Sequence, residues 1–345
     1  MEKLIQKVFK DFYPDKPILS YTTINSGLIN GTYKIDTADE CYVLQKMNQV
    51  VFKNIKALLN NKVKTTCYLN ANGFPTLTFI SNKDGLFYLE DDDVIWQLST
   101  YIPSMVLDRI DSNEIASQVG NYLAKFHTAL LNFPVLDLEY TIPDFHNTIK
   151  RFCDFEESVK NASPERLSEA KESIEFLESN FKNIETVANA INSGRIPIRV
   201  VHNDTKVGNM LFDENGNILC IIDFDTVMPG SILHDVGDAL RTGANTSNEE
   251  EKDLSKVRFD VEIYEALMKA YVEEASFMSD EEAQNIHLSL PLILFEQACR
   301  FLGDYLNNDI YYSTTYEDQN LVRAKTQIKL MDSVQLYLET KKIVY

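Results

Sequence analysis

No stretch of the sequence is apolar for long enough to cross a membrane as a helix, although 44% of the residues are hydrophobic. The first nine residues mix charged and apolar side chains. They lack both the long apolar core and the small-residue cleavage site of a secretory signal. We expect them to form one amphipathic helix that ends near Tyr13 and Pro14. These absences predict a cytoplasmic protein that has no membrane partner.

Cysteine is scarce, and its spacing follows no known pattern. The five residues are odd in number, contain no Cys-x-x-Cys pair and are scattered along the chain: Cys41, Cys67, Cys153, Cys220 and Cys299. This excludes a disulfide framework and a zinc site of the usual spacing, and it fits a reducing compartment.

The sequence has fewer basic than acidic residues. It contains 33 Lys and Arg and 52 Asp and Glu, which gives a formal net charge of −19. Such a charge repels nucleic acid and anionic membranes, so neither is expected as a partner. The stretch from Cys41 to Lys83 is an exception, since it has no Asp or Glu and six lysines: Lys46, Lys53, Lys56, Lys62, Lys64 and Lys83. Two interpretations stay open, an anionic ligand such as nucleotide phosphates or a solvated basic helix face.

The hydrophobic patterning changes at Pro103. Before it, period-two alternation and one apolar stripe predict strands at 33–37, 41–47, 75–81, 86–89 and 94–102, and a helix at 51–63. After it, helical periodicity predicts a helix capped by residues 111–112 and others at 160–190, 288–306 and 320–340. At 345 residues the chain is too long for one ordinary core. We therefore predict an α+β architecture with a β-rich lobe at 1–102 and a helical lobe at 103–345, and a ligand cleft between them.

The most informative segment runs from His202 to Asp225. A short apolar run leads into His202-Asn203-Asp204-Thr205-Lys206-Val207-Gly208-Asn209, and a second one leads into Asp223-Phe224-Asp225. A turn at 213–217 joins the two runs, which predicts a hairpin with polar residues at both ends. This layout is expected to bring Asp204, Lys206, Asn209 and Asp223 close together.

These four side chains are what phosphoryl transfer requires. A carboxylate such as Asp204 can accept the proton of an attacking hydroxyl. The oxygens of Asn209 and Asp223 are ligands that Mg²⁺ prefers. The Lys206 ammonium can neutralise charge on the transferring group. The segment therefore predicts an ATP- and Mg²⁺-dependent phosphotransferase.

The spacing His202-x-Asp204-x-Lys206-x-x-Asn209 resembles the catalytic loop of protein kinases, and Asp223-Phe224-Asp225 stands where those enzymes have Asp-Phe-Gly. The chain has no Ala-Pro-Glu segment. Asp235-Val236-Gly237-Asp238 is similar instead to the signature of the aminoglycoside phosphotransferase and choline kinase superfamily. That resemblance implies a protein-kinase-like bilobal fold in which the first lobe binds nucleotide and the second carries catalysis and substrate binding.

A tighter resemblance is to N-acetylhexosamine 1-kinases, which use ATP to phosphorylate the anomeric hydroxyl of GlcNAc or GalNAc. It rests on the segments 202–206, 222–230 and 238–246, on 27–33, 42–46 and 51–54 in the first lobe, and on 300–306 near the end. It thus spans most of the chain and implies a small sugar as the substrate.

The resemblance also implies a role for each matched position. Asp204 would be the base, and Asn209 with Asp223 the Mg²⁺ ligands. Nucleotide contacts would come from the loop 27–32 over the phosphates and from the hinge 100–102 at adenine, through Gly27, Asn30, Thr32, Thr100 and Ile102. The sugar would contact Asp223, Thr226, Arg300 and Tyr311.

Three positions depart from the kinase pattern. The strand lysine of kinases falls at Gln45, next to Lys46, and only one of these neighbours can face the phosphates. We favour Lys46 because of its charge. The helix at 51–63 has no acid to pair with such a lysine, and Thr242 stands where an aromatic residue is expected to pack on the sugar.

Two other functions compete with a sugar kinase. One is a kinase of the same fold that acts on choline or an aminoglycoside, which the net charge favours and Arg300 disfavours. The other is a nucleotide-binding pseudokinase. Two polar residues have structural interpretations: we expect His127 to be hydrogen-bonded within a helix core, and Asp235 to bind the backbone of the catalytic loop rather than metal.

Overall fold

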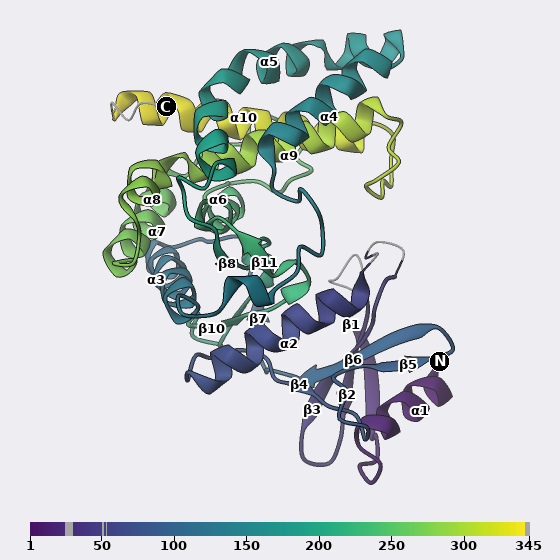
Figure 1. Cartoon of the computed structure of the whole chain (residues 1–345). Helices are drawn as coiled ribbons and strands as arrows, with labels where there is room; N and C mark the ends of the chain where they lie inside the picture. The colour runs from purple at the N-terminus through teal and green to yellow at the C-terminus, as the bar shows by residue number, and fades with distance from the viewer. Residues whose placement is uncertain (25–29, 50–51, 53, 342–345) are drawn as a thin grey trace. The chain divides into compact units, whose positions relative to one another are not determined.

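The computed structural model describes residues 1–24, 30–49, 52 and 54–341 (Figure 1). The chain divides into two compact units. The first contains Met1–Met105, Ala129–Pro143 and Met210–Pro229, and the second contains Val106–Thr128, Asp144–Asn209 and Gly230–Tyr345. This differs from a single break after residue 102. Two later segments join the first unit because their side chains and backbone bind the helix at 55–71, for example through Asn61, which donates to the carbonyls of Glu139 and Val227.

The first unit is built on an antiparallel sheet with the strand order β1-β2-β3-β6-β4, in which β5 also pairs with β6. The strands are β1 (Ser20–Ile24), β2 (Gly31–Asp36), β3 (Cys41–Lys46), β4 (Phe79–Ile80), β5 (Leu89–Asp91) and β6 (Val94–Thr100). The predicted hairpin of β2 and β3 is confirmed, with Gly31 opposite Lys46 and Asp36 opposite Cys41. β1 was not predicted, and β4 is shorter than the run at 75–81 suggested.

A helix packs on each face of this sheet. Helix α1 (Glu2–Phe12) buries Ile5, Val8, Phe9 and Phe12 against the face that carries Tyr42. Helix α2 (Ile55–Ala71) packs with Ile95 on the opposite face. Asn54 caps α2 by accepting from the Ala57 N–H, so the helix begins later than predicted and continues well beyond Val63.

The rest of the first unit consists of the one-turn helix η1 (Val135–Asp137), the hairpin of β9 (Met210–Phe212) and β10 (Ile218–Ile221), and the one-turn helix η3 (Phe224–Thr226). The hairpin turn is closed by Asp213, which accepts from the backbone N–H groups of Asn215 and Asn217. The predicted hairpin between the two polar motifs is therefore confirmed. The short strands β7 (Met105–Val106) and β11 (Met228–Gly230) lie where the chain passes from one unit to the other.

The second unit is mainly helical, and α9 lies at its centre. Helix α9 (Ser289–Leu306) is buried on nearly every side and packs against α4, α5, α6 and α10 (Figure 1). The other elements are α3 (Asn113–Ala129), α4 (Thr148–Asn161), α5 (Pro164–Asn192), β8 (Arg199–Val201), η2 (Val207–Asn209), α6 (Ile232–Gly243), α7 (Val261–Glu274), α8 (Asp280–Asn285), η4 (Ile286–Leu288) and α10 (Gln319–Thr340). Across the part of the chain that is described, no helix has the length and apolar character needed to span a membrane.

The contact of α6 with α9 depends on a glycine. A Cβ added at Gly237 would lie 2.2 Å from the Ser289 carbonyl oxygen and 2.8 Å from Ile293. At Gly303, also in α9, the nearest atom to such a Cβ is the Ser158 hydroxyl, at 3.4 Å. A comparison of alanine substitutions at Gly237 and Gly303 therefore distinguishes the loss of close helix packing from the general effect of adding a methyl group to a helix.

We expect Gly237→Ala to lower the free energy of unfolding by about 1–3 kcal/mol, because the two helices must move apart. Gly303→Ala should be neutral or raise it by up to about 1 kcal/mol, because alanine favours the helix. Urea unfolding of both variants measures the difference, and equal midpoints would show that α6 and α9 do not pack through Gly237.

Candidate active site

The catalytic loop in the second unit brings together three of the predicted residues. The Lys206 ammonium lies 2.8 Å from Oδ2 of Asp204. Asn209 donates from Nδ2 to the same oxygen, at 2.9 Å, and to the backbone carbonyl of Asp204, also at 2.9 Å. The backbone and side chain of Asp204 are thus fixed by residues two and five positions later in the chain. The motif spacing matters because it allows these local bonds.

The charge state of Asp204 follows from these neighbours. Burial alone would raise the pKa of its carboxyl, but the adjacent Lys206 ammonium and the bond from Asn209 hold the pKa below its usual value. Asp204 is therefore an ionised carboxylate at neutral pH. Such a group can accept a proton or orient a hydroxyl.

Asp235 in α6 holds this loop in place. Its carboxylate accepts from the backbone N–H groups of His202, at 2.9 Å, and Asn203, at 2.7 Å. Asn203 has a left-handed backbone, with φ of 64°, which turns the chain there. His127 in α3 lies 3.0 Å from Asp235 through Nε2 and 2.9 Å from the Tyr271 hydroxyl through Nδ1. The structural interpretations of both Asp235 and His127 are confirmed.

A second support for the loop was not predicted. His146 binds the Asn203 carbonyl through Nε2, at 3.1 Å, and the fully buried Glu296 through Nδ1, at 2.7 Å. The ring of His234 stacks on His146 with the centroids 4.7 Å apart. Neither ring nitrogen of His234 finds a hydrogen-bond partner among the residues that the structure describes. These side chains come from three distant segments, so no local pattern in the sequence could have revealed them.

Asp238 and Arg241 form a buried pair beside the loop. The guanidinium binds Oδ1 of Asp238 through Nε, at 2.9 Å, and Nη2, at 2.8 Å, and also pairs with Glu249. Within the described chain, Oδ2 of Asp238 is buried and has no hydrogen-bond partner. Burial raises the pKa of Asp238, and the charge of Asp204 adds to the effect.

Thr242, expected near the sugar, instead binds the loop. Its hydroxyl accepts from the Val207 N–H at 3.0 Å and donates to the Asp238 carbonyl at 3.2 Å. The side chain thus links α6 to the catalytic loop.

Asp223, Asp225 and Thr226 lie in the first unit, at η3. Asp223 precedes η3 in a left-handed conformation, with φ of 66°. The Asp225 carboxylate pairs with Lys62 of α2, with Nζ 2.5 Å from Oδ1, and accepts from Nδ2 of Asn30 at 2.7 Å through Oδ2. Asn30 is a predicted nucleotide contact, whereas Lys62 was only counted among the basic residues.

The strand faces separate Gln45 from Lys46. Lys46 is exposed and lies on the same face of β3 as Leu44, which packs on α1. A Cβ at Gly31 would lie 3.5 Å from the Lys46 Cβ and 3.6 Å from the Tyr33 hydroxyl, which places Lys46 on the α1 side. Gln45 points to the opposite face, the one that carries Ile95 and α2. The two side chains are therefore assigned to opposite faces, and the preference for Lys46 as the nucleotide contact stays a prediction.

The remaining predicted nucleotide contacts have different surroundings. Gly27 lies outside the described residues. Thr32 is in β2, opposite Gln45. Thr100 ends β6, and its N–H donates to the Thr78 carbonyl, so this donor is used within the sheet. The Ile102 carbonyl accepts from the Ser104 hydroxyl.

Arg300 and Tyr311, the predicted sugar contacts of the second unit, lie together. The Arg300 guanidinium lies over two rings, 5.2 Å from the centre of Phe145 and 5.8 Å from that of Tyr312. Burial would lower the pKa of Arg300, but the nearby Tyr312, Glu296 and Tyr311 raise it above its usual value. Asp304 at the end of α9 fixes the following backbone by accepting from three successive N–H groups, those of Ile310, Tyr311 and Tyr312. The side chain of Tyr311 is nevertheless 67% exposed.

Each unit carries one of the two predicted Mg²⁺ ligands. In the second unit the amide nitrogen of Asn209 donates to Asp204, so its oxygen is the atom that can bind a cation. In the first unit the Asp223 carboxylate is a hard oxygen donor of the kind that Mg²⁺ prefers. Among the residues that the structure describes, no group of three His, Cys, Asp or Glu forms a metal cage. Mg²⁺ commonly binds one or two protein oxygens together with substrate phosphates.

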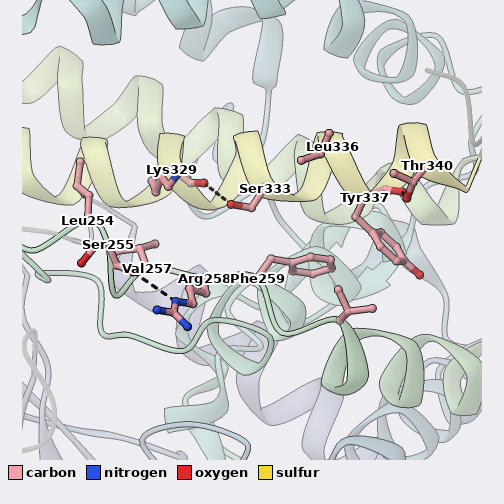
Figure 2. Close-up of a pocket in the computed structure, with 11 residues that line it drawn as sticks. Leu254, Ser255, Val257, Arg258, Phe259, Lys329, Ser333, Leu336, Tyr337 and Thr340 are labelled. Carbon is pink, nitrogen blue, oxygen red and sulfur yellow. Dashed lines mark hydrogen bonds between the residues drawn. The ribbon is translucent and has the colours of Figure 1, made fainter.

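A pocket elsewhere in the second unit contains none of these residues. It lies between α10 and the segment 254–261, and its lining includes Leu254, Phe259, Leu336 and Tyr337 (Figure 2). No predicted site residue lines it.

Comparison with known proteins places these features in a family. The model of a family described as a phosphotransferase enzyme family matches residues 20–271, more than half of the chain. The match includes the catalytic loop, Asp223 and all of α6.

Solved structures are similar over almost the whole chain. An aminoglycoside phosphotransferase from Alicyclobacillus acidocaldarius is 13% identical, with a TM-score of 0.63 over 97% of this chain and 96% of its own. Spectinomycin phosphotransferase in complex with ADP and spectinomycin is 12% identical, with a TM-score of 0.65 over 98% and 97%. A microcompartment-associated aminopropanol kinase is 13% identical, with a TM-score of 0.65 over 99% of both chains. These likenesses confirm the predicted protein-kinase-like α+β fold.

The buried His234 predicts a pH dependence of stability. Burial, together with the nearby His146, lowers the pKa of His234 to about 3, whereas in the unfolded chain it stays near 6.5. Between these values the unfolded state binds a proton that the folded state does not. His234 therefore makes the protein less stable as the pH falls from about 6.5 towards 3.

We expect His234→Phe, which keeps an aromatic ring against His146, to reduce this loss by up to about 1.4 kcal/mol per pH unit. Chemical unfolding at pH 8, 6, 5 and 4 measures it. At pH 8 both the wild-type histidine and the phenylalanine are uncharged. The difference in the free energy of unfolding at this pH therefore measures the effect of packing alone. Parallel curves for the two proteins would contradict a buried neutral His234.

Proposed function

The chain belongs to the phosphotransferase enzyme family, and on that premise we propose that it is an ATP-dependent kinase that phosphorylates a hydroxyl group of a small molecule. The observation that carries the proposal is the geometry of Asp204, whose ionised carboxylate is held by Lys206 and Asn209 in one loop. The finer proposal is an N-acetylhexosamine 1-kinase, which acts on the anomeric hydroxyl of GlcNAc or GalNAc.

In this proposal each group of the loop has one task. Asp204 accepts the proton of the attacking hydroxyl, and Lys206 keeps Asp204 ionised and offers positive charge near the transferring phosphoryl group. Asn209 and Asp223 hold Mg²⁺, which neutralises charge on the nucleotide phosphates when it is bound. Asp235 and His146 keep the backbone of the loop in position through their bonds to residues 202 and 203.

The nucleotide is proposed to bind to the first unit. The loop that contains Gly27 and ends at Asn30 and Thr32 would cover the phosphates, and the backbone at Thr100 and Ile102 would face adenine. Lys46, on the α1 face of the sheet, is the proposed lysine contact, and Gln45 on the opposite face is the alternative.

A neutral sugar is the proposed acceptor. The contacts assigned to it are Asp223, Thr226, Arg300 and Tyr311. Arg300 supports a neutral acceptor, because a cationic alcohol would be repelled by the guanidinium that Phe145 and Tyr312 hold.

A second candidate is a cationic acceptor such as choline, an aminoglycoside or another amino alcohol. Its support is the buried Asp238, which has an unbonded carboxylate oxygen and lies close enough to Asp204 for the two charges to interact. The net charge of −19 points the same way. The similar spectinomycin phosphotransferase and aminopropanol kinase are named for acceptors that contain amines.

A panel of acceptors with ATP and Mg²⁺ tests the two candidates. We expect ADP release with GlcNAc or GalNAc, with the phosphate on the anomeric oxygen, and little with choline, aminopropanol or spectinomycin. Turnover of an amine in preference to the sugars would overturn the finer proposal and leave the kinase assignment standing.

Asp204→Asn tests the base. We expect kcat to fall by about 10²–10⁴, because the amide cannot accept the proton, while the affinity for ATP stays within about a factor of three. Steady-state kinetics and nucleotide titration measure the two quantities, and Glu250→Gln on the exposed surface is a matched control. A variant as fast as the wild type would contradict the role of Asp204. A wild type that binds ATP but acts on no acceptor would indicate a pseudokinase.

A further inference from the structure

We propose that Lys62 of α2 is a positioning residue for phosphoryl transfer, which acts through Asp225 to fix the turn that carries Asp223. The inference rests on the proposed function for the role of Asp223. It does not depend on which acceptor is used.

The pair of Lys62 and Asp225 is almost completely buried. Lys62 is 2% exposed and Asp225 is 6% exposed. The ammonium lies 2.5 Å from Oδ1 of Asp225 and 5.3 Å from the centre of the Phe79 ring. A lysine is rarely buried to this extent unless it is paired, and an aromatic face at this distance offers it further stabilisation.

The other oxygen of Asp225 is also held. Asn30 donates to Oδ2 at 2.7 Å, while its own Oδ1 accepts from the Asn48 N–H at 3.0 Å. Asp225 therefore has a strong partner at each carboxylate oxygen, one from α2 and one from the chain next to β2. Its orientation is determined by both.

The neighbour of Lys62 holds the other end of the same turn. Asn61 is fully buried, and its Nδ2 donates to the Val227 carbonyl at 3.0 Å and to the Glu139 carbonyl at 2.8 Å. Its Oδ1 accepts from the Glu139 N–H at 3.1 Å. Two consecutive residues of α2 thus bind Asp225 and Val227. The left-handed Asp223 lies immediately before this braced turn.

The charges are reversed relative to the kinase pattern. Protein kinases place the lysine on a strand and the pairing glutamate on the helix. Here the strand position is Gln45, the helix supplies Lys62, and the acid is Asp225 in η3. Helix α2 contains no Asp or Glu, so the acid that pairs with Lys62 comes from outside the helix.

A buried ion pair often adds little stability compared with apolar residues of the same shape, whereas removal of one partner is costly. The role that the pair of Lys62 and Asp225 can serve here is to position Asp223. Asp223 lies two residues from Asp225, and a ligand carboxylate that shifts by about an ångström loses much of its effect.

The test uses Lys62→Met, Asp225→Asn and the double variant, with Lys64→Met as control. Lys64 lies on the exposed side of α2, where it donates to the Asp137 carbonyl. For each protein we would measure the Tm, the Mg²⁺ concentration that gives half-maximal binding of a non-hydrolysable ATP analogue, and kcat with the best acceptor.

We expect each single variant to lose Tm, because one buried charge is left alone. The double variant should recover most of the Tm, because neither charge is left. It should still need at least tenfold more Mg²⁺ for nucleotide binding and show at least a tenfold lower kcat, with the acceptor KM within a factor of three. Lys64→Met should match the wild type in all these measurements.

A double variant with the Mg²⁺ requirement of the wild type would overturn the inference, because the pair would then serve stability alone. A double variant that does not fold would overturn it in the same way. If the wild type acts on no acceptor while the double variant still needs more Mg²⁺ to bind nucleotide, the role of Lys62 stands and the proposed function fails.

Discussion

The buried carboxylate of Asp235 is the interaction on which the catalytic loop depends. It accepts from two successive backbone N–H groups, those of His202 and Asn203, and His127 and Tyr271 continue the chain of bonds. Burial would raise the pKa of Asp235, but His127 and these bonds hold it below its usual value. A charged acceptor suits these N–H donors best, because both are removed from water. Asp235 of α6 is thereby joined directly to the loop and to α3, and through His127 to α7.

In both units, acids of the candidate site are held by charged or hydrogen-bonding partners. Three acids of the candidate site are each paired with a cation: the buried Asp225 with Lys62, the buried Asp238 with Arg241, and the half-buried Asp204 with Lys206. These contacts lie within one unit in every case. Each unit therefore orders its own share of the candidate site residues. The net charge of −19 does not describe these positions, where each acid has a cationic partner.

Sequence reasoning found the parts of the site that local spacing determines. Asp204, Lys206 and Asn209 bind one another within five residues, so their motif could be recognised and their contacts followed from it. It could not assign a strand face to Lys46 or Gln45, because the face of a residue at a strand end depends on the register with its neighbours. Lys62 could not be identified in this way, because the kinase pattern has an acid and not a lysine on the corresponding helix. His146 and His234 come together only through tertiary packing, and nothing in their local sequence marks them.

After α9, the path of the backbone is fixed independently of the exposed side chain at position 311. Asp304 binds three successive N–H groups there, so the path of the chain at Tyr311 does not depend on the side chain at that position. Tyr311 is 67% exposed, and its ring contacts Tyr312 with the centroids 4.8 Å apart. Substitutions of Tyr311 are therefore expected to change the free energy of unfolding only slightly. Under the proposed function, substitutions of Tyr311 can change the preference for one acceptor over another while the fold and the loop at 202–209 stay unchanged.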